Sequence, residues 1–484
     1  MRVLHVCSEL FPVLKTGGLA DVAGALPLAL NNFDCESRVL VPGFPAFMNL
    51  NGDKYLVAEL GAMFGAASVN LYFTKLENGI ELYIIDAPEL FDRLGNPYAD
   101  SNNQAYTDNY RRFALLGFLA MKLADNLDPH WRAELIHGHD WHAGLASVYL
   151  KAEEIRRGHK LAGSVFTVHN LAYQGVFPPH VFGELQLPEW FFNMHGIEFH
   201  NQVSFLKAGL YFSVKITTVS PSYAHEIQGD EQGCGLNGLL QSRSQDLVGI
   251  LNGIDLEVWS PSADKLLTAN YTIRNMTGKA KCKMALQEYS GLEVQAEKPL
   301  FAIVSRLTEQ KGLNLVLAGA GEIISRGGQV VILGSGDAEL ERGFKELAAQ
   351  YPASFAVQLG YDENHAHRIV AGSDVIMVPS RFEPCGLTQL YGLHYGTLPL
   401  VRKVGGLADT VVDCSLENLA DGSASGFVFD DFNVVGFTAA VKRAFALYER
   451  KADWKKVQKY TMQQSLGWDS SAAKYYQLYQ QVIG

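Results

Sequence analysis

The fold of the second half of this chain is decided by one stretch, Asp374-Val375-Ile376-Met377-Val378-Pro379-Ser380-Arg381-Phe382-Glu383-Pro384-Cys385-Gly386-Leu387-Thr388. Its first six residues form an apolar run that is typical of a buried parallel strand. A segment of helical length, 387–396, follows and closes with a glycine. Pro384 suits the entry to a helix, because it has no N–H to lose. The next backbone N–H groups would then face an anion beside Glu383, namely those of Cys385, Gly386, Leu387 and Thr388. An ordinary strand-to-helix loop with a surface glutamate is the alternative.

Further strand-like runs alternate with helical stretches on both sides of this one. In the second half they are 301–305, 329–333, 355–359, 375–378 and 398–401, and in the first half 2–8, 80–86, 165–168 and 215–220. This alternation predicts an α/β protein with two doubly wound parallel sheets. A last amphipathic helix is expected over 470–483, behind a serine cap. The predicted domains are residues 1–246 and 247–463, followed by a C-terminal helical segment, 464–484, that packs back on the first domain.

Composition limits the class of partner and compartment. The 484 residues are 48% hydrophobic and 19% charged, with a net charge of −11, which favours a soluble protein of two domains and argues against nucleic acid or an anionic membrane as the main partner. The six cysteines include no C-x-x-C pair, so a zinc site and a disulfide framework are both disfavoured. No signal peptide or membrane-spanning stretch is recognisable, and we expect a cytoplasmic location.

One five-residue string occurs twice. Gly17-Gly18-Leu19-Ala20-Asp21 recurs as Gly405-Gly406-Leu407-Ala408-Asp409, each copy after a predicted strand. Two glycines before a helix let the backbone approach a ligand closely, and Lys15 would add a cation to the first copy. The two copies are therefore predicted to face one cleft from opposite sides, although a simple turn is the alternative for either copy.

Polar residues gather after two strands of the first half. The run 137–142 contains three histidines and Asp140, but its spacing matches no zinc motif, so we expect a polar patch that lines a cleft rather than a metal site. His169 and Asn170 close the 165–168 strand, at the strand end where open α/β sheets bind ligands. Capping a turn is the alternative role for His169.

A cationic pair follows the 301–305 strand. Arg306 and Lys311 stand five residues apart, at the same sheet edge as the Glu383 loop, and this predicts a diphosphate site rather than a solvated surface. Because a loop cation is not part of the core, we expect truncation of either residue to leave stability within about ±0.5 kcal/mol.

A further glycine motif, Gly334-Ser335-Gly336, follows the 329–333 strand. It lacks the third glycine of the motif that binds nicotinamide cofactors, so it is only a weak indication of such a cofactor.

Together these motifs resemble the bacterial and plant glycogen and starch synthases. The matching segments run over nearly the whole chain: 15–19, 139–142, 169–175, 305–307 with 310–312, and 381–388. The resemblance implies the GT-B fold, two Rossmann-like domains across a deep cleft, with the acceptor on the first and the nucleotide-sugar donor on the second. It also implies a retaining transfer of glucose from ADP-glucose to the non-reducing end of glycogen or another α-1,4-glucan, with no cofactor. Many retaining enzymes of this fold carry a second glutamate eight residues after the first, but Tyr391 stands there, so no role that needs two glutamates carries over.

The same resemblance implies a role for each site residue. Arg306 and Lys311 would neutralise the diphosphate, with the amides of 385–388 and the Gly17-Gly18 loop. Lys15 would contact the nucleotide sugar, and His169 and Asn170 would bind the glucosyl group, the His169 carbonyl facing the anomeric carbon. Glu383 would contact sugar hydroxyls and steady positive charge on the ring. Asp140 would line the acceptor side, and Asn252 and Tyr361 the nucleotide end.

Residue chemistry agrees with a metal-free reaction. No two aspartates stand two residues apart, so the Asp-x-Asp that holds a divalent cation in many nucleotide-sugar enzymes is missing, and fixed cations must stabilise the leaving group instead. Base specificity is not encoded in any residue we can single out, which leaves a UDP-glucose enzyme open. Three further classes of protein are alternatives, each with a feature against it. The joint presence of Arg306, Lys311 and Glu383 weighs against a non-catalytic glucan-binding protein, and the incomplete G-x-G disfavours a nicotinamide-dependent oxidoreductase. A pyridoxal-phosphate phosphorylase is disfavoured because such chains are much longer than 484 residues.

Overall fold

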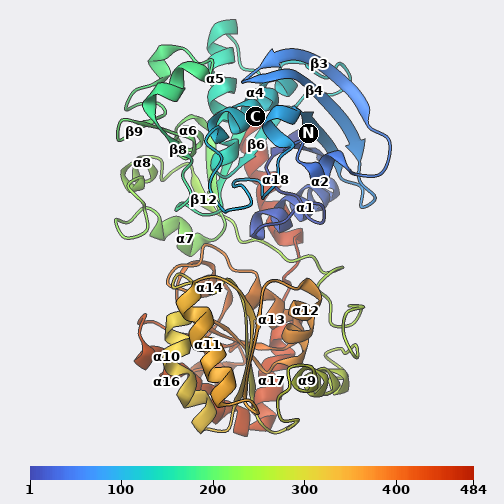
Figure 1. The fold of residues 1–484 in the computed structure, drawn as a ribbon, viewed down its shortest axis with the longest axis vertical. Coiled ribbons are helices and arrows are strands. Elements are labelled where there is room, and N and C mark those ends of the chain that lie inside the picture. The colour runs from blue at the N-terminus through green and yellow to red at the C-terminus, as the bar shows by residue number, and fades with distance from the viewer. The chain divides into compact units, whose positions relative to one another are not determined.

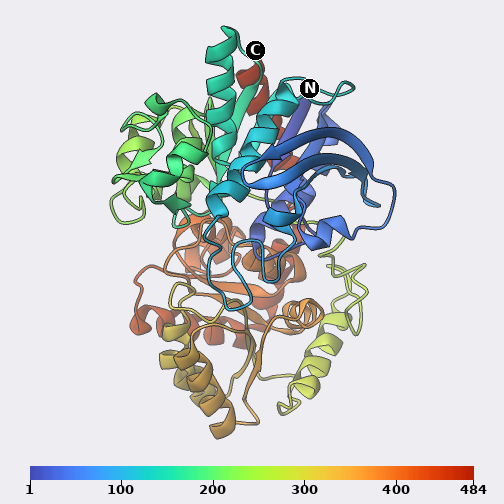
Figure 2. The ribbon, with the colours of Figure 1, turned by 45° about the horizontal axis from the view of Figure 1, so that its top comes forward.

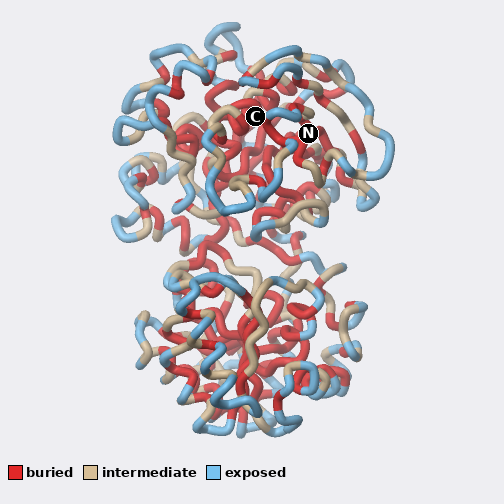
Figure 3. The backbone as a smooth tube through the Cα atoms, in the orientation of Figure 1, coloured by how far each residue is buried: buried red, intermediate tan, exposed pale blue.

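The computed structural model describes all 484 residues, which form two compact units. The first comprises Met1–Gly253 and Trp468–Gly484, and the second Ile254–Gly467. The boundary predicted at 246/247 is corrected, because residues 247–249 form an edge strand of the first unit's sheet. The closing segment likewise joins the first unit at Trp468 rather than at residue 464. Each unit has its own buried core, drawn in red in Figure 3.

The first unit is built on a nine-stranded sheet. In spatial order its strands are β12 (Leu247–Gly249), β11 (Lys215–Thr218), β7 (Gly163–Val168), β6 (Leu135–His139), β1 (Arg2–Val6), β2 (Glu36–Pro42), β5 (Glu81–Asp86), β4 (Ala66–Lys75) and β3 (Tyr55–Met63). All pairs from β12 to β5 are parallel, whereas β4 and β3 extend the sheet antiparallel, as the blue strand pair of Figure 2. The doubly wound parallel sheet is as predicted, and the antiparallel edge is an addition that the sequence did not indicate. Three short strands, β8 (Val176–Phe177), β9 (Glu198–Phe199) and β10 (Gln202–Ser204), form a separate antiparallel sheet.

Helices cover both faces of the nine-stranded sheet (Figure 1). They are α1 (Gly18–Leu30), α2 (Pro45–Met48), α3 (Pro88–Phe91), α4 (Asn109–Ala124), α5 (Leu145–Arg157), α6 (Phe205–Phe212), α7 (Pro221–Glu226), α8 (Asn237–Ser242) and α18 (Asp469–Ile483). Along β1, Val3 packs into the core beneath α1 and α18, whereas Leu4 and Val6 pack into the core beneath α4 and α5, as the period of two requires. The closing helix α18 begins at Asp469 without a side-chain cap, so the expected serine cap is wrong.

The second unit is a doubly wound parallel sheet of six strands. Their order is β15 (Phe355–Leu359), β14 (Gln329–Gly334), β13 (Leu300–Val304), β16 (Val375–Val378), β17 (Leu398–Arg402) and β18 (Phe427–Phe429), of which only β18 is absent from the sequence expectation. Its helices are α9 (Thr277–Tyr289), α10 (Leu313–Ser325), α11 (Ala338–Gln350), α12 (Glu363–Gly372), α13 (Thr388–Tyr395), α14 (Gly405–Thr410), α15 (Leu416–Asp421), α16 (Val434–Glu449) and α17 (Lys451–Gln463). Helices α10, α11 and α16 pack on one face and α9, α12 and α13 on the other (Figure 1).

The parallel strands of each sheet wind outward in two directions from one reversal point. In the second unit the chain winds from β13 to β15 in one direction and from β16 to β18 in the other, so the reversal lies between β13 and β16. In the first unit it lies between β1 and β6. Open α/β sheets bind ligands outside the carboxyl ends of the strands at such a point. The topology therefore selects the loops after these four strands. No helix of either unit combines the length and the apolar character that crossing a membrane requires.

Candidate functional site

The two loops at the reversal point of the second unit are joined to each other. Arg381 N donates to Gln310 O at 2.8 Å, and the Arg381 guanidinium pairs with Glu309 at 2.6 Å. Gly312 has φ +74°, and a Cβ there would lie 2.0 Å from the Pro379 carbonyl oxygen. Because only glycine allows this approach, Gly312 fixes the loop after β13 against the loop after β16.

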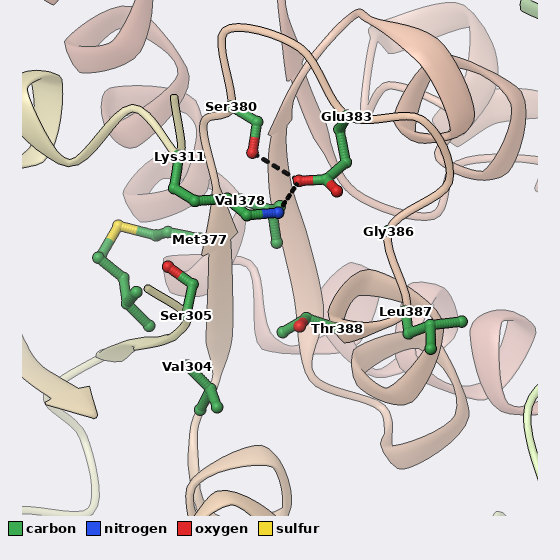
Figure 4. A pocket seen from close by; sticks show the side chains of 11 residues that line it. Val304, Ser305, Lys311, Met377, Val378, Ser380, Glu383, Gly386, Leu387 and Thr388 are labelled. Carbon is green, nitrogen blue, oxygen red and sulfur yellow. Dashed lines mark hydrogen bonds and ion pairs between the residues drawn. The ribbon is translucent and has the colours of Figure 1, made fainter. Parts of the chain in front are cut away.

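This junction brings Lys311 onto Glu383. The Lys311 ammonium lies 2.6 Å from Glu383 Oε2, and the Ser380 hydroxyl donates to the same oxygen at 2.8 Å (Figure 4). Glu383 is only 6% exposed, so its charge is held almost entirely by these two partners. Together with Ser305, Thr388 and apolar side chains of β13 and β16, they line a cavity of about 60 Å³. Ser380 was not singled out in the sequence, where only its place in the loop beside Glu383 could have indicated it.

Arg306 has a different environment from Lys311. It is exposed, and the only hydrogen bond of its side chain is a long one of 3.4 Å from Nη2 to Gln310 Oε1. The two predicted cations thus share a loop, but Lys311 is engaged with Glu383 whereas Arg306 extends into solvent. An exposed guanidinium can rearrange toward an anion at little cost, since it gives up almost no contact.

The amides after Glu383 lie in the loop that leads into α13, which begins later than the entry predicted at Pro384. Helix α13 begins at Thr388, with Leu387 at the capping position. Gly386 has φ +71°, and a Cβ there would lie 2.3 Å from the Gln389 side chain, whose Nε2 donates to the carbonyls of Cys385 and Gly386. The first amides of a helix have no acceptor within it, and they carry its positive end. The loop 385–388 can therefore present donors to an anion.

The second glycine string, residues 405–409, packs against the backbone of the Glu383 loop. Gly406 N donates to the carbonyls of Glu383 and Pro384 at 3.1 and 3.2 Å. A Cβ on Gly405, whose φ is +46°, would lie 2.0 Å from Glu383 O, and one on Gly406 would lie 2.1 Å from Cys385 O. These glycines thus serve close packing against the loop, and the expectation that they line a ligand site is revised.

In the first unit, the loop after β1 is organised by a residue that sequence analysis did not single out. Glu9 is 3% exposed, and its carboxylate accepts from Thr16 N at 2.6 Å, Gly17 N at 3.2 Å and the Tyr98 hydroxyl at 2.5 Å. Burial and the nearby Glu9 charge raise the pKa of Tyr98 well above its usual value. A carboxylate directly after a buried strand was the available signal, but the aromatic partner lies 89 residues further on.

The first glycine string has an open environment. A Cβ on Gly17 would meet nothing within 4 Å, and both Gly17, at the capping position of α1, and Gly18, its first residue, are exposed. Lys15 lies beside them and pairs with Asp21, the last residue of the string, at 2.9 Å. The predicted loop is thus present, with its cation held by an ion pair rather than mobile.

Asp140 ties the ends of two neighbouring strands together. It follows β6 with φ +60°, and its Oδ1 accepts from His169 N at 2.9 Å and from Asn170 N at 3.4 Å, just after β7. Burial raises the pKa of Asp140 to about 7, against the opposing effect of these two amides. The structure therefore brings together the predicted residues Asp140, His169 and Asn170.

Three histidines lie beneath this edge, between the sheet and α18. His5, His137 and His139 are fully buried, and their ligand atoms lie within 4.8 Å of one another. Both ring nitrogens of His137 already have partners, since Nδ1 lies 2.7 Å from the Tyr479 hydroxyl and Nε2 lies 2.6 Å from the Thr167 hydroxyl. A metal would have to displace these bonds, so the cluster fits a hydrogen-bonded core better than a metal centre.

Two predicted nucleotide contacts fall in different units. Asn252 is buried near the end of the first unit, and its Oδ1 has no hydrogen-bond partner. Tyr361 is 67% exposed in the second unit, between β15 and α12. The exposed ring of Tyr361 is available for stacking.

Comparisons with known proteins add independent findings. The family described as "Starch synthase catalytic domain" matches residues 2–242, and "Glycosyl transferases group 1" matches residues 290–460. Glycogen synthases of Francisella tularensis subsp. novicida (strain U112) and subsp. tularensis (strain WY96-3418) are each 63% identical to this chain over 485 residues, which is 100% of this chain and 99% of the relative.

Solved structures also include a starch synthase that is similar over the whole chain. The catalytic domain of starch synthase IV from Arabidopsis thaliana, bound to ADP and acarbose, is 30% identical with a TM-score of 0.90, over 100% of this chain and 99% of that one. A sucrose-phosphate synthase from Thermosynechococcus elongatus is 17% identical with a TM-score of 0.61, again over 100% and 99% of the two chains, and is similar in fold alone.

Proposed function

The chain belongs to the family of starch and glycogen synthases, and we propose that it elongates glycogen or another α-1,4-glucan by transferring glucose from ADP-glucose to the non-reducing end. It is a hexosyltransferase of the GT-B fold. Retention of the anomeric configuration and independence from divalent metal are parts of the proposal. The observation that carries it is the meeting of Lys311 and Glu383 at the reversal point of the second sheet, beside the start of α13, whose amides would bind phosphate.

In the second unit, the proposed task is to hold the diphosphate. Arg306 and Lys311 supply positive charge, and the amides of residues 385–388 supply donors at the start of α13. Charge on the leaving diphosphate grows as the glycosidic bond breaks, so fixed cations stabilise the transition state more than the bound donor. When a diphosphate draws the Lys311 ammonium away, Glu383 keeps Ser380 as a partner, and its carboxylate is then available to sugar hydroxyls. Tyr361 would contact the nucleotide.

In the first unit, the proposed task is to bind sugar. His169 and Asn170 would hold the glucosyl group, with the His169 carbonyl directed at the anomeric carbon, and Asp140 would line the acceptor side. Lys15 and the Gly17-Gly18 loop would contact the phosphates, and Asn252 the nucleotide. The bonds from Asp140 to the backbone amides of His169 and Asn170 support this grouping, because they hold the Asp140 carboxylate against the backbone of the other two residues. We propose the cytoplasm as the location, where the six free cysteines would stay reduced.

Donor specificity is tested by comparing ADP-glucose with UDP-glucose on a glycogen primer. Release of ADP with incorporation of glucose supports the proposal, and incorporation only from UDP-glucose would identify the UDP-glucose enzyme instead. Binding of glucan without turnover of either donor would favour a non-catalytic glucan-binding protein. The anomeric configuration follows from digestion of the product by an α-1,4-specific amylase.

Metal independence is tested in the same assay with EDTA. The expected result is an unchanged rate, because Arg306, Lys311 and the helix start replace the divalent cation. A rate abolished by EDTA and restored by Mg²⁺ or Mn²⁺ would contradict this part of the proposal. The purified protein should show no absorbance band of a nicotinamide or pyridoxal cofactor.

A further inference from the structure

A chain of three histidine rings connects the core of the first unit to its predicted sugar-binding edge. His5 Nδ1 lies 3.2 Å from His139 Nε2, and His139 Nδ1 lies 3.1 Å from His169 Nε2. His5 and His139 are fully buried, whereas His169 is half-buried. The second nitrogen of His169, Nδ1, has no hydrogen-bond partner within the protein, so it is the nitrogen available to a ligand.

The rings of this chain are neutral, because burial lowers the pKa of His5 and of His169 to about 3 and that of His139 well below its usual value. A neutral imidazole carries one N–H, and each link of the chain needs one donor and one acceptor. Only two arrangements satisfy both links. In the first, His5 Nδ1–H donates to His139, His139 Nδ1–H donates to His169, and the proton of His169 sits on its outer Nδ1. In the second, every bond points the other way, His5 carries its proton on Nε2, and His169 Nδ1 is a bare acceptor.

The far end of the chain decides between these arrangements. His5 Nε2 is buried and has no hydrogen-bond partner. The second arrangement places an N–H there with no acceptor, whereas the first leaves only an unprotonated nitrogen. Buried N–H groups without an acceptor are rarer in native structures than incompletely satisfied acceptors, because the desolvated donor loses its full hydrogen-bond energy. The first arrangement is therefore favoured.

We propose that His5 and His139 are positioning residues that hold His169 in the Nδ1–H tautomer, so that it donates a hydrogen bond outward. This rests on the proposed function for the identity of the acceptor, a hydroxyl oxygen of the bound glucosyl group. A fixed donor discriminates a sugar oxygen from a donating or apolar group, and the buried chain keeps the proton of His169 on Nδ1.

A matched control lies in the same cluster. The His137 ring is 4.1 Å from the His139 ring and equally buried, but it bonds to Tyr479 and Thr167 and makes no link to His169. Loss of the His137 nitrogens should therefore disturb packing without changing the proton on His169.

The tautomer is measured directly by long-range ¹H–¹⁵N correlation on protein labelled at histidine nitrogens, at pH 7 and without ligand. The His169 signal is identified by its disappearance in His169→Asn. The expected spectrum has a protonated Nδ1 and an unprotonated Nε2. A protonated Nε2, or a doubly protonated ring, would overturn the proposal, and neither outcome depends on which reaction the enzyme catalyses.

Variants test whether the chain matters for turnover. In His139→Phe, which keeps a ring but removes both nitrogens, His169 should show mixed tautomers, and kcat should fall about tenfold to a hundredfold, as is typical when the partner that orients a functional histidine is lost. His139→Asn, whose amide can still donate to His169 Nε2, should recover the tautomer and part of the activity. His137→Phe should leave both unchanged, and ADP binding should be unaffected in all three. A wild-type kcat and tautomer in His139→Phe would refute the positioning role.

Discussion

The reversal points of the two sheets are similar in topology and opposite in chemistry. In the second unit, the loops after β13 and β16 bring together an ion pair, Lys311 with Glu383, next to the exposed cation Arg306. In the first unit, the loops after β1 and β6 lie above neutral, buried histidines, and burial raises the pKa of Asp140 to about 7. The difference fits the two proposed tasks, because charge would stabilise a departing diphosphate and neutral directed hydrogen bonds would hold a sugar.

The two copies of Gly-Gly-Leu-Ala-Asp show the same divergence. In the first copy Gly17 and Gly18 are exposed, and a Cβ on Gly17 would meet nothing within 4 Å, whereas in the second copy Gly405 and Gly406 are packed against Glu383 and Cys385 at distances that leave no room for a side chain. Identical glycines thus leave free space around the backbone in one unit and allow close packing in the other. Each of the following experiments tests one side of this contrast against the other.

The largest effect is expected at the charged site. Lys311→Ala should lower kcat about a hundredfold or more, or ~3 kcal/mol, because one preorganised donor to the leaving group is lost. It should also lower stability by about 1–3 kcal/mol, since the buried Glu383 loses a charged partner. This replaces the expectation from sequence that truncation of Lys311 would leave stability within about ±0.5 kcal/mol. Steady-state kinetics and urea unfolding measure the two effects.

Arg306→Ala is the matched control for Lys311→Ala. It should show a comparable loss of kcat with stability within about ±0.5 kcal/mol, because the exposed Arg306 side chain makes only one long hydrogen bond. If either variant kept a wild-type kcat and only bound ADP more weakly, that residue would serve as an anchor rather than as a stabiliser of the transition state.

A smaller effect is expected where the second glycine string supports the Glu383 loop. Gly405→Ala should cost about 1–3 kcal/mol of stability, because its Cβ would lie 2.0 Å from Glu383 O. It should also lower kcat, since Glu383 must shift. Gly422→Ala is the control that separates backbone strain from the steric clash with Glu383. Gly422 also has a positive φ, +81°, but nothing lies within 4 Å of its Cβ position. An equal loss of kcat in both variants would argue against specific support of the loop.

In the first unit, the raised pKa of Asp140 should make the stability of the protein depend on pH. Because the folded-state pKa of Asp140 is raised to about 7, the unfolded chain releases this proton first as pH rises. The contribution of Asp140 to stability is thus fully present below about pH 4 and is lost as pH rises toward about 7. Relative to Asp140→Asn, which does not titrate, the wild type should lose stability across this range in urea unfolding. A pH-independent difference between the two would show that Asp140 has an ordinary pKa.

The smallest effect is expected at the open glycine string. Gly17→Ala should leave the melting temperature unchanged, with stability within about ±0.5 kcal/mol, since Gly17 has extended backbone and free space around its Cβ position. The KM for the donor should nevertheless rise, because a methyl group would intrude on the loop proposed to approach the nucleotide. A fall in melting temperature as large as that of Gly405→Ala would remove the contrast between the two copies.

The sequence by itself determined the α/β class and most of the strands. Apolar runs such as 375–378 are long enough to be recognised without their partners, and the residues that follow them identified Glu383, Lys311 and His169 as candidates. Hydrophobic periodicity carries this information because it depends only on neighbours along the chain. The antiparallel pair of β3 and β4 was missed, since β3 is largely exposed and buried residues do not alternate regularly along β4.

Tertiary structure alone decided which strand ends meet. Strands β13 and β16 are neighbours although more than 70 residues separate them, and only this pairing places Lys311 on Glu383. The Tyr98 bond to Glu9 and the link from His139 to His169 arise in the same way, from residues far apart in the chain. Strand order, the polarity of a histidine chain and the space around a glycine all depend on contacts between distant segments, and no local pattern of residues encodes them.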